Sequence, residues 1–295
     1  MAGPARISTP HEPAVSIVVP VYNEEESLPV LVAEIRAALA DGPDYELLLV
    51  DDGSTDGSPA ALARLAAAEP RIRVLRLARN GGQSAALAAG FRHARAPVTV
   101  TLDADLQNDP ADIPRLLAAL AAGGSDVVCG VRAERQDDWV RRVSSRIANG
   151  VRNRLTHERV TDVGCTLRAC RTEYLRRVPV FAGMHRFLPT LLRMEGARIE
   201  EVPVRHRPRR YGRAKYGIGN RLWRGLADLL AVRWMQSRWI DRGNVEEITA
   251  WDRNTPPSGS SSASSGRPSS SAASSSSGSP PSAAGRASFP TPSGT

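Results

Sequence analysis

Two patterns alternate along the first half of the chain. Short apolar segments that end in turns are separated by segments in which Ala and Leu recur at helical spacing. The apolar segments lie at 15–20, 45–52, 72–77, 97–105 and 126–130, and the helical ones at about 27–40, 58–68, 83–94 and 111–122. Strands that alternate with helices through short connections favour a parallel sheet covered by helices on both faces. We therefore predict an α/β fold with a Rossmann-like, mostly parallel sheet.

Polar clusters follow three of the predicted strands. Tyr22-Asn23-Glu24 follows the first strand, Asp51 to Ser54 the second, and Asp103 to Asp105 the fourth. Ligands of parallel sheets bind beyond the carboxyl ends of the strands, so we expect the three clusters to line one crevice. Asp51 and Asp52 would there accept hydrogen bonds from a base or a ribose. The alternative is that they only form a turn and a cap.

The fourth strand leads into the acidic stretch 102-LDADLQNDP-110. Asp103 and Asp105 lie two residues apart, and Gln107 follows after two more. Carboxylate and amide oxygens suit Mg²⁺ or Mn²⁺, and Mg²⁺ is commonly held by one or two carboxylates together with substrate phosphates. An isolated Asp-x-Asp would equally serve to cap the next helix. We predict a divalent-metal site formed by Asp103, Asp105 and Gln107.

The charge balance indicates an anionic partner. The chain has a formal net charge of +8 and a pI near 10.2, which is typical of proteins that bind nucleotides, phospholipid surfaces or nucleic acids. It has no GxGxxG after the first strand and no GxxxxGK[ST], which excludes the dinucleotide fingerprint and the P-loop. We expect a metal ion and cationic side chains to neutralise the ligand's phosphates instead.

Other features bear on compartment and order. The three cysteines, Cys129, Cys165 and Cys170, lack metal-ligand spacing and fit a reducing compartment. The N-terminus has no apolar leader, and no apolar run reaches the roughly 18 residues of a spanning helix, so we expect neither secretion nor a membrane span. We expect disorder in residues 1–13 and in the Ser/Pro/Gly-rich tail at 255–295.

Two segments combine a helical apolar stripe with arginines. In 138–156, apolar residues recur every four positions, and 217–245 repeats the pattern with three tryptophans. A basic amphipathic helix with Trp is typical of a membrane surface, whereas an apolar stripe alone more often packs on a core. We expect core packing for 138–156 and peripheral membrane contact for 217–245.

Several stretches resemble a known family. The stretches 19-VPVYNEEESL-28, 50-VDDGSTDGS-58, 79-RNGGQSAALAAG-90 and 102-LDADLQNDP-110 are similar to family 2 glycosyltransferases with the GT-A fold. The later stretches 161-TDVGCTLRAC-170 and 205-RHRPRRYGRAKYG-217 resemble the branch of dolichyl- and polyprenyl-phosphate sugar synthases, such as dolichol-phosphate mannose synthase. The resemblance covers roughly residues 14–235 and implies a GT-A domain over residues 14–216.

The resemblance also implies roles for individual residues. Asp105, Arg132, Arg209 and Lys215 would be catalytic, and Asp103, Asp105 and Gln107 would hold the metal ion. Arg141 and Ser145 would hold the lipid phosphate. The nucleotide-sugar contacts would come from Pro20, Tyr22, Glu24, Asp51, Asp52, Asp103, Ala104, Asp105, Arg132, Arg209 and Lys215.

The expected reaction transfers a sugar from GDP-mannose or a UDP-hexose to a polyprenyl or dolichyl phosphate, with inversion, at the cytoplasmic face of a membrane. An acceptor phosphate is largely ionised at neutral pH, since its second pKa is about 6, and needs cations more than a general base. A hydroxyl acceptor would instead call for a base, for which Asp162 is the candidate, although Asp162 equally suits a structural cap. His157, His185 and His206 are expected to be packing or surface residues. A different class, a basic nucleic-acid-binding protein, is disfavoured by the acidic strand ends and the lack of a recognised module.

Overall fold

The structure is a computed structural model of the 295-residue chain. It describes residues 12–132, 150, 161–162, 164–211 and 219–240, with side chains from 225 onward in the last range. The predictions for the N-terminal segment, for 138–156 and for the tail at 255–295 therefore fall wholly or mainly outside the described residues.

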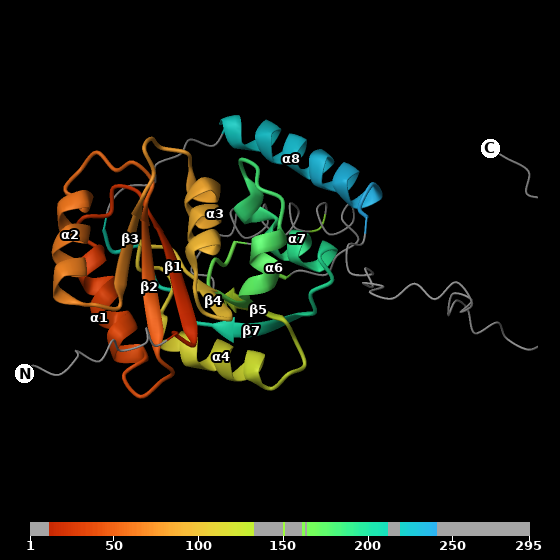
Figure 1. The fold of residues 1–295 in the computed structure, drawn as a ribbon. Coiled ribbons are helices and arrows are strands. Elements are labelled where there is room, and N and C mark those ends of the chain that lie inside the picture. Colours follow the sequence, from red (N-terminus) through yellow and green to blue (C-terminus); the bar gives the residue numbers. More distant parts are fainter. Residues whose placement is uncertain (1–11, 133–149, 151–160, 163, 212–218, 241–295) are drawn as a thin grey trace, which may run out of the picture. The chain divides into compact units, whose positions relative to one another are not determined.

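The strands of the described part form one mixed sheet in the order β3-β2-β1-β4-β6-β5-β7 (Figure 1). Their bounds are β1 Val15–Val21, β2 Tyr45–Asp51, β3 Ile72–Arg76, β4 Val98–Thr101, β5 Val127–Arg132, β6 Arg168–Arg171 and β7 Ile199–Val204. β1 pairs in parallel with both β2 and β4, and β5 pairs in parallel with β7. Only β6 runs antiparallel, between β4 and β5. The prediction of a mostly parallel α/β sheet is thus confirmed, and β6 and β7 are additions to it.

Helices cover both faces of this sheet. The helices and short 3₁₀ turns are α1 Leu28–Ala38, α2 Ser58–Ala68, α3 Gln83–His93, η1 Pro110–Asp112, α4 Ile113–Ala121, α6 Thr172–Arg177, η2 Met184–Arg186, α7 Leu188–Met194 and α8 Gly219–Ser237. Side chains alternate between the faces of a strand. On β1, Ile17 and Val19 therefore pack into a core with α1, α2 and α4, whereas Val18 packs into a second core with α3, α7 and α8.

Local chemistry explains where the early helices begin. Pro29, Pro59 and Pro114 stand in the first turns of α1, α2 and α4, where the fixed φ of proline suits the helix and its missing N–H is not needed. Inside α3, Gly90 packs so closely on β1 that a Cβ there would collide with Val18. The helix therefore lies tight against the sheet, and its first residues, Gln83 and Ser84, reach the carboxyl edge.

Candidate active site

The loops after β1 and β2 are bonded to each other at the carboxyl edge of the sheet. The N–H of Asn23 donates to Ser54 Oγ at 3.0 Å, and Asn23 Oδ1 accepts from the N–H of Thr55 at 2.8 Å. Because β1, β2 and β4 are parallel, the loop that follows β4 leaves the sheet at the same edge. The three strand-end polar clusters therefore share one edge, as their sequence positions indicate.

Asp51 and Asp52 are both buried, and the side chain of each accepts a hydrogen bond from a backbone N–H group. Asp51 Oδ1 accepts from the N–H of Ser54 at 2.8 Å, and Asp52 Oδ1 accepts from the N–H of Gly81 at 2.7 Å. Burial raises the pKa of Asp52, and the N–H groups of Gly81 and Gly82 oppose that rise. Gly53, in the loop after β2, has a φ of 70°. A Cβ there would lie 2.8 Å from the backbone nitrogen of Asn80, in the loop after β3. Asp51 and Asp52 therefore shape the turn after β2 and hold the loop after β3 beside it.

The other residues expected around the nucleotide lie beside this turn. Pro20, near the end of β1, and Tyr22 and Glu24, in the loop after it, are each half-buried. The N–H of Glu24 donates to Ser58 Oγ at 2.8 Å, and its side chain accepts from Ser27 Oγ at 3.0 Å. Glu24 thus ties the loop to the starts of α1 and α2.

The acidic loop after β4 places its carboxylates in contact with side chains from distant segments. Asp103 Oδ1 accepts from Gln83 Nε2 at 2.8 Å, and Asp105 Oδ2 accepts from Arg209 at 2.7 Å. Burial and the negative charge of Asp105 raise the pKa of Asp103 to about 7. Ala104 is buried between the two carboxylates. Leu106 has a φ of 64°, an uncommon conformation for a side-chain-bearing residue that is found at functional sites.

The carboxylate oxygens of this loop suit a divalent cation whose remaining coordination positions are filled by a ligand's phosphate oxygens. Two carboxylates repel each other at one strand end, which is the electrostatic situation that a cation relieves. The loop is also tight, since Asp105 Oδ1 accepts from the N–H of Gln107 at 3.1 Å. Within the described residues, no three His, Cys, Asp or Glu side chains gather in metal-binding geometry. The predicted set therefore has two carboxylates and the amide of Gln107, which leaves positions for phosphate oxygens.

An arginine-rich segment, residues 205–209, runs along the acidic loop. His206 forms an isolated antiparallel bridge with Asn108, and the N–H of Arg207 donates to the Gln107 carbonyl at 2.9 Å. Every second side chain of the segment then meets a carboxylate: Arg205 pairs with Asp109 and Asp112, Arg207 with Asp109 and Glu34, and Arg209 with Asp105.

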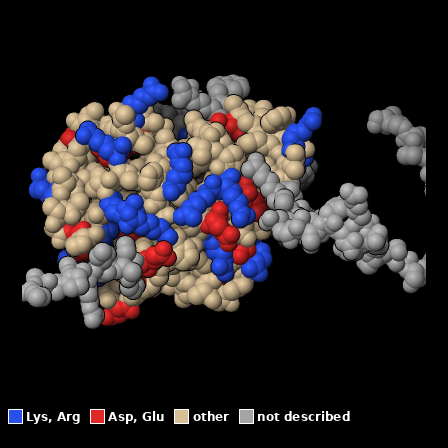
Figure 2. All heavy atoms as spheres, viewed as in Figure 1, with Lys and Arg blue, Asp and Glu red and all other residues tan. Residues whose placement is uncertain are grey.

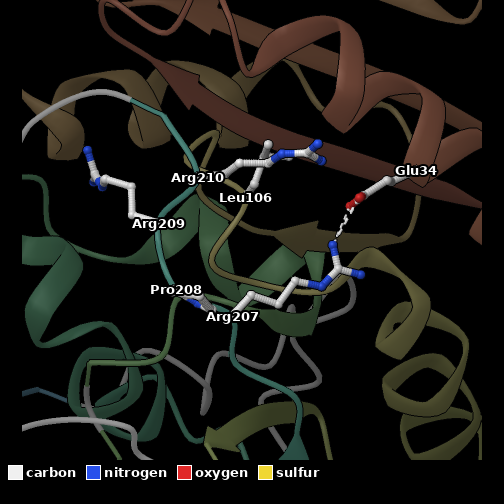
Figure 3. Close-up of a pocket in the computed structure, with 6 residues that line it drawn as sticks. All are labelled: Glu34, Leu106, Arg207, Pro208, Arg209 and Arg210. Carbon is white, nitrogen blue, oxygen red and sulfur yellow. Dashed lines mark hydrogen bonds and ion pairs between the residues drawn. The ribbon is translucent and has the colours of Figure 1, made fainter.

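A cavity of about 300 Å³ lies under this segment. It is lined by Leu106 of the acidic loop, Glu34 of α1 and residues 207–210 (Figure 3). Figure 3 shows the ion pair between Glu34 and Arg207 at one side of the cavity, with Arg209 at the opposite side. The segment is thus anchored at Arg207, two residues before Arg209, which reaches the predicted metal site.

Arg132 and Asp162 form a bidentate ion pair. Arg132 Nε and Nη2 donate to Asp162 Oδ2 and Oδ1 at 2.7 and 2.8 Å. Arg132 is the last residue of β5, and Asp162 belongs to the segment that leads to β6. That segment continues to Thr166, whose Oγ1 accepts from Asn108 at 2.8 Å. The ion pair therefore lies on a loop that borders the acidic loop.

Some predicted residues fall elsewhere. Arg141, Ser145, Lys215 and His157 lie outside the described residues. His185 is a packing residue, because its Nδ1 lies 2.9 Å from Ser84 Oγ, and burial lowers the pKa of His185 to about 4. Sequence reasoning missed Gln83 as a partner of Asp103, and Arg205 and Arg207 as anchors. The alternation of arginines at 205, 207 and 209 was the available signal for the anchors.

A family model matches more than half of this sequence, and curated relatives match much of it as well. The model described as glycosyl transferase family 2 matches residues 16–178. An undecaprenyl-phosphate 4-deoxy-4-formamido-L-arabinose transferase of Edwardsiella ictaluri (strain 93-146) is 45% identical over 207 residues, which are 69% of this chain. The chain spans 63% of that relative's length.

Solved structures share the fold. A mannosyltransferase from Pyrobaculum calidifontis, solved with GDP-Man and Mn²⁺, superposes with a TM-score of 0.54 at 24% identity, over 78% of this chain and 65% of the other. A glucosyl-3-phosphoglycerate synthase from Mycobacterium tuberculosis, solved with Mn²⁺, UDP and phosphoglyceric acid, gives 0.59 at 21% identity, over 78% and 81%. At these identities the likeness establishes a GT-A fold.

Proposed function

Because the chain belongs to glycosyltransferase family 2, we propose that it transfers a sugar from a nucleotide-diphospho-sugar to a polyprenyl phosphate. One observation carries the proposal: two carboxylates and a guanidinium, those of Asp103, Asp105 and Arg209, meet at the carboxyl edge of the sheet. Carboxylates that hold a cation and an arginine beside them are what a diphosphate needs. The Mn²⁺ and nucleotides named for the two solved neighbours support this assignment.

In the proposed reaction, Asp103, Asp105 and Gln107 hold Mg²⁺ or Mn²⁺, and the metal ion supplies charge stabilisation for the departing diphosphate. Pro20, Tyr22 and Glu24 lie beside the base, and Asp51 and Asp52 hold the turn against which the ribose rests. Arg209 neutralises negative charge that develops on the leaving oxygen. Lys215 would act with Arg209.

The proposed acceptor is an ionised phosphate. Its oxygen attacks the anomeric carbon, the bond from that carbon to the diphosphate breaks, and the electron pair leaves with the nucleoside diphosphate. One displacement of this kind inverts the anomeric configuration. The lipid named for the Edwardsiella relative supports a polyprenyl phosphate, and Arg141 and Ser145 are the residues proposed to hold it.

A lipid acceptor requires contact with a membrane, and we assign that contact to α8. No helix among the described residues is long and apolar enough to span a bilayer. α8 buries Leu229 and Val232 in the second core, whereas Leu226, Leu230 and Trp234 are exposed at intervals of four residues. An exposed apolar stripe with exposed arginines beside it, Arg233 and Arg238, suits an anionic surface. We propose peripheral binding at the cytoplasmic face.

The test uses the full-length protein with radiolabelled GDP- and UDP-sugars, Mn²⁺ or Mg²⁺ and a short-chain polyprenyl phosphate. We expect label to enter the lipid phase with one donor, and to be lost with EDTA and in Asp105→Ala. Label that enters water-soluble hydroxyl acceptors alone would overturn the acceptor assignment. No binding of any nucleotide sugar would overturn the transferase assignment.

A further inference from the structure

The carboxylate of Asp162 is buried and surrounded by donors. Its residue is 4% exposed. Oδ1 accepts from Arg132 Nη2 at 2.8 Å and from the N–H of Gly164 at 3.2 Å, and Oδ2 accepts from Arg132 Nε at 2.7 Å and from the N–H of Arg132 at 3.2 Å. A carboxylate has about four lone-pair positions. Four N–H groups already occupy them.

This arrangement fixes the orientation of the Arg132 side chain. Two of the five N–H bonds of the guanidinium face Asp162, so the other three point away from it. Gly164 leaves room for the guanidinium, because a Cβ there would lie 2.7 Å from Arg132 Nη2. The backbone N–H of Arg132 binds the same carboxylate. The main chain and side chain of Arg132 are therefore held by a single group.

The same arrangement is poorly suited to general-base catalysis. A base must offer a lone pair to the proton that it abstracts. Asp162 would first have to give up a charge-assisted hydrogen bond to the guanidinium of Arg132, which is only 18% exposed, and breaking a largely buried ion pair is costly.

We infer that Asp162 is a positioning residue, which holds the guanidinium of Arg132 toward an anionic phosphate in the site, and that it removes no proton from the acceptor. This inference rests on the proposed function and deepens it. An acceptor that needs no base is one whose attacking oxygen is already ionised, and a phosphate monoester meets that condition near neutral pH.

The chain offers a matched control. Asp126 binds the side chain and backbone of Arg198 in the same manner, with Nε and backbone N–H at 3.0 Å and Nη2 at 3.2 Å. Asp126 precedes β5, whereas Arg132 ends it, so this second pair lies at the opposite edge of the sheet. Asp126→Asn repeats the chemical change away from the site.

The experiment is a double-mutant cycle in the full-length protein with Arg132→Ala, Asp162→Asn and the double variant. We expect Asp162→Asn to lower kcat/KM by up to about 100-fold, as misplacement of a positioning group does. The double variant should then be no slower than Arg132→Ala alone. The kcat–pH profile of Asp162→Asn should keep its wild-type shape, and Asp126→Asn should lower Tm without changing kcat/KM.

Two results would overturn the inference: multiplied losses in the double variant, or the disappearance of an acidic limb of the profile in Asp162→Asn. If the wild type labels only a hydroxyl acceptor, the proposed function fails, and the cycle is run with that acceptor. If the wild type labels no acceptor, the affinity of the wild type and of the three variants for the donor nucleotide is compared instead. A loss in Asp162→Asn that persists without Arg132 would then overturn the inference.

Discussion

At the scale of single residues, side chains at this edge mostly bind backbone or opposite charges. In addition to the roles proposed for them, Asp51 holds the turn that follows it, Asp52 holds the loop after β3, and Glu24 binds the start of α2. The contacts of Asp51 and Asp52 agree with the turn part of the alternative interpretation, whereas the helices that follow, α2 and α3, have no side-chain cap at their N-cap residues. The turn contacts do not compete with ligand binding, since a nucleotide needs those loops in place.

His185 makes a prediction about stability at acidic pH. Burial, and after it the charges of Arg186 and Arg168, lower the pKa of His185 from about 6.5 to about 4. The unfolded chain binds this proton near pH 6.5 and the folded chain does not, so stability is full above pH 6.5 and falls as the pH drops toward 4. The loss is at most about 3 kcal/mol.

Urea unfolding of wild type and His185→Asn at pH 7, 6, 5 and 4 measures this effect. Asn keeps an acceptor for Ser84 Oγ but does not titrate. We expect the variant to lose less stability than the wild type across that range. Parallel curves for the two proteins would show that another group causes the acid sensitivity.

At the scale of elements, segment 205–209 and α8 are attached to the rest of the fold in different ways. The segment is bound to the acidic loop through its backbone and alternating arginines. α8 packs one face on the second core and presents the other outward, and Figure 1 shows it as the blue helix at the top of the view.

The outward face of α8 predicts binding to anionic membranes. Leu230 and Trp234 are 57% and 65% exposed. Leu230→Glu should weaken binding to vesicles that contain anionic lipid, because it removes apolar area and adds a repelled charge. Ala63→Glu, on an exposed position of α2, adds the same charge elsewhere and should weaken binding less. Equal losses in a vesicle sedimentation assay would contradict a role for this face.

At the scale of the whole molecule, the basic side chains of the described residues do not gather into one uniform patch on the face that Figure 2 shows. Figure 2 shows basic and acidic side chains beside one another on the face in view. Arg205, Arg207 and Arg209 each pair with a carboxylate. Arginines paired in this way suit a site that binds a small anionic ligand together with a metal cation. The expected absence of nucleic-acid binding stays a prediction.

The two-carboxylate site predicts that metal and nucleotide bind together. Since no third His, Cys, Asp or Glu of the described residues joins Asp103 and Asp105 in a metal-binding group, Mn²⁺ should bind weakly alone and more tightly when a nucleoside diphosphate supplies phosphate oxygens. Linkage requires the reverse to hold equally. Calorimetric titration of each in the presence and absence of the other measures the coupling, which Asp105→Asn should remove. Tight Mn²⁺ binding without nucleotide would contradict the assigned ligand set.

Features that depend on neighbouring residues were readable from the sequence alone. Short apolar segments and helical spacing of Ala and Leu indicated five strands and four helices close to their observed bounds. Strand-end polarity then located the acidic loop, because parallel strands must end at one edge. The family resemblance rested on the same local stretches.

Tertiary structure decided what depends on contacts between distant residues. The contact between Arg209 and Asp105 joins residues 104 positions apart. The pairing of Arg132 with Asp162 requires β6 to turn back between β4 and β5, and β6 has only four residues. So short a strand carries little periodicity, and an ion pair leaves no local pattern in either partner. The edge of the sheet that carries the candidate site was therefore determined by the sequence, whereas the partner of each charge was decided only by the folded chain.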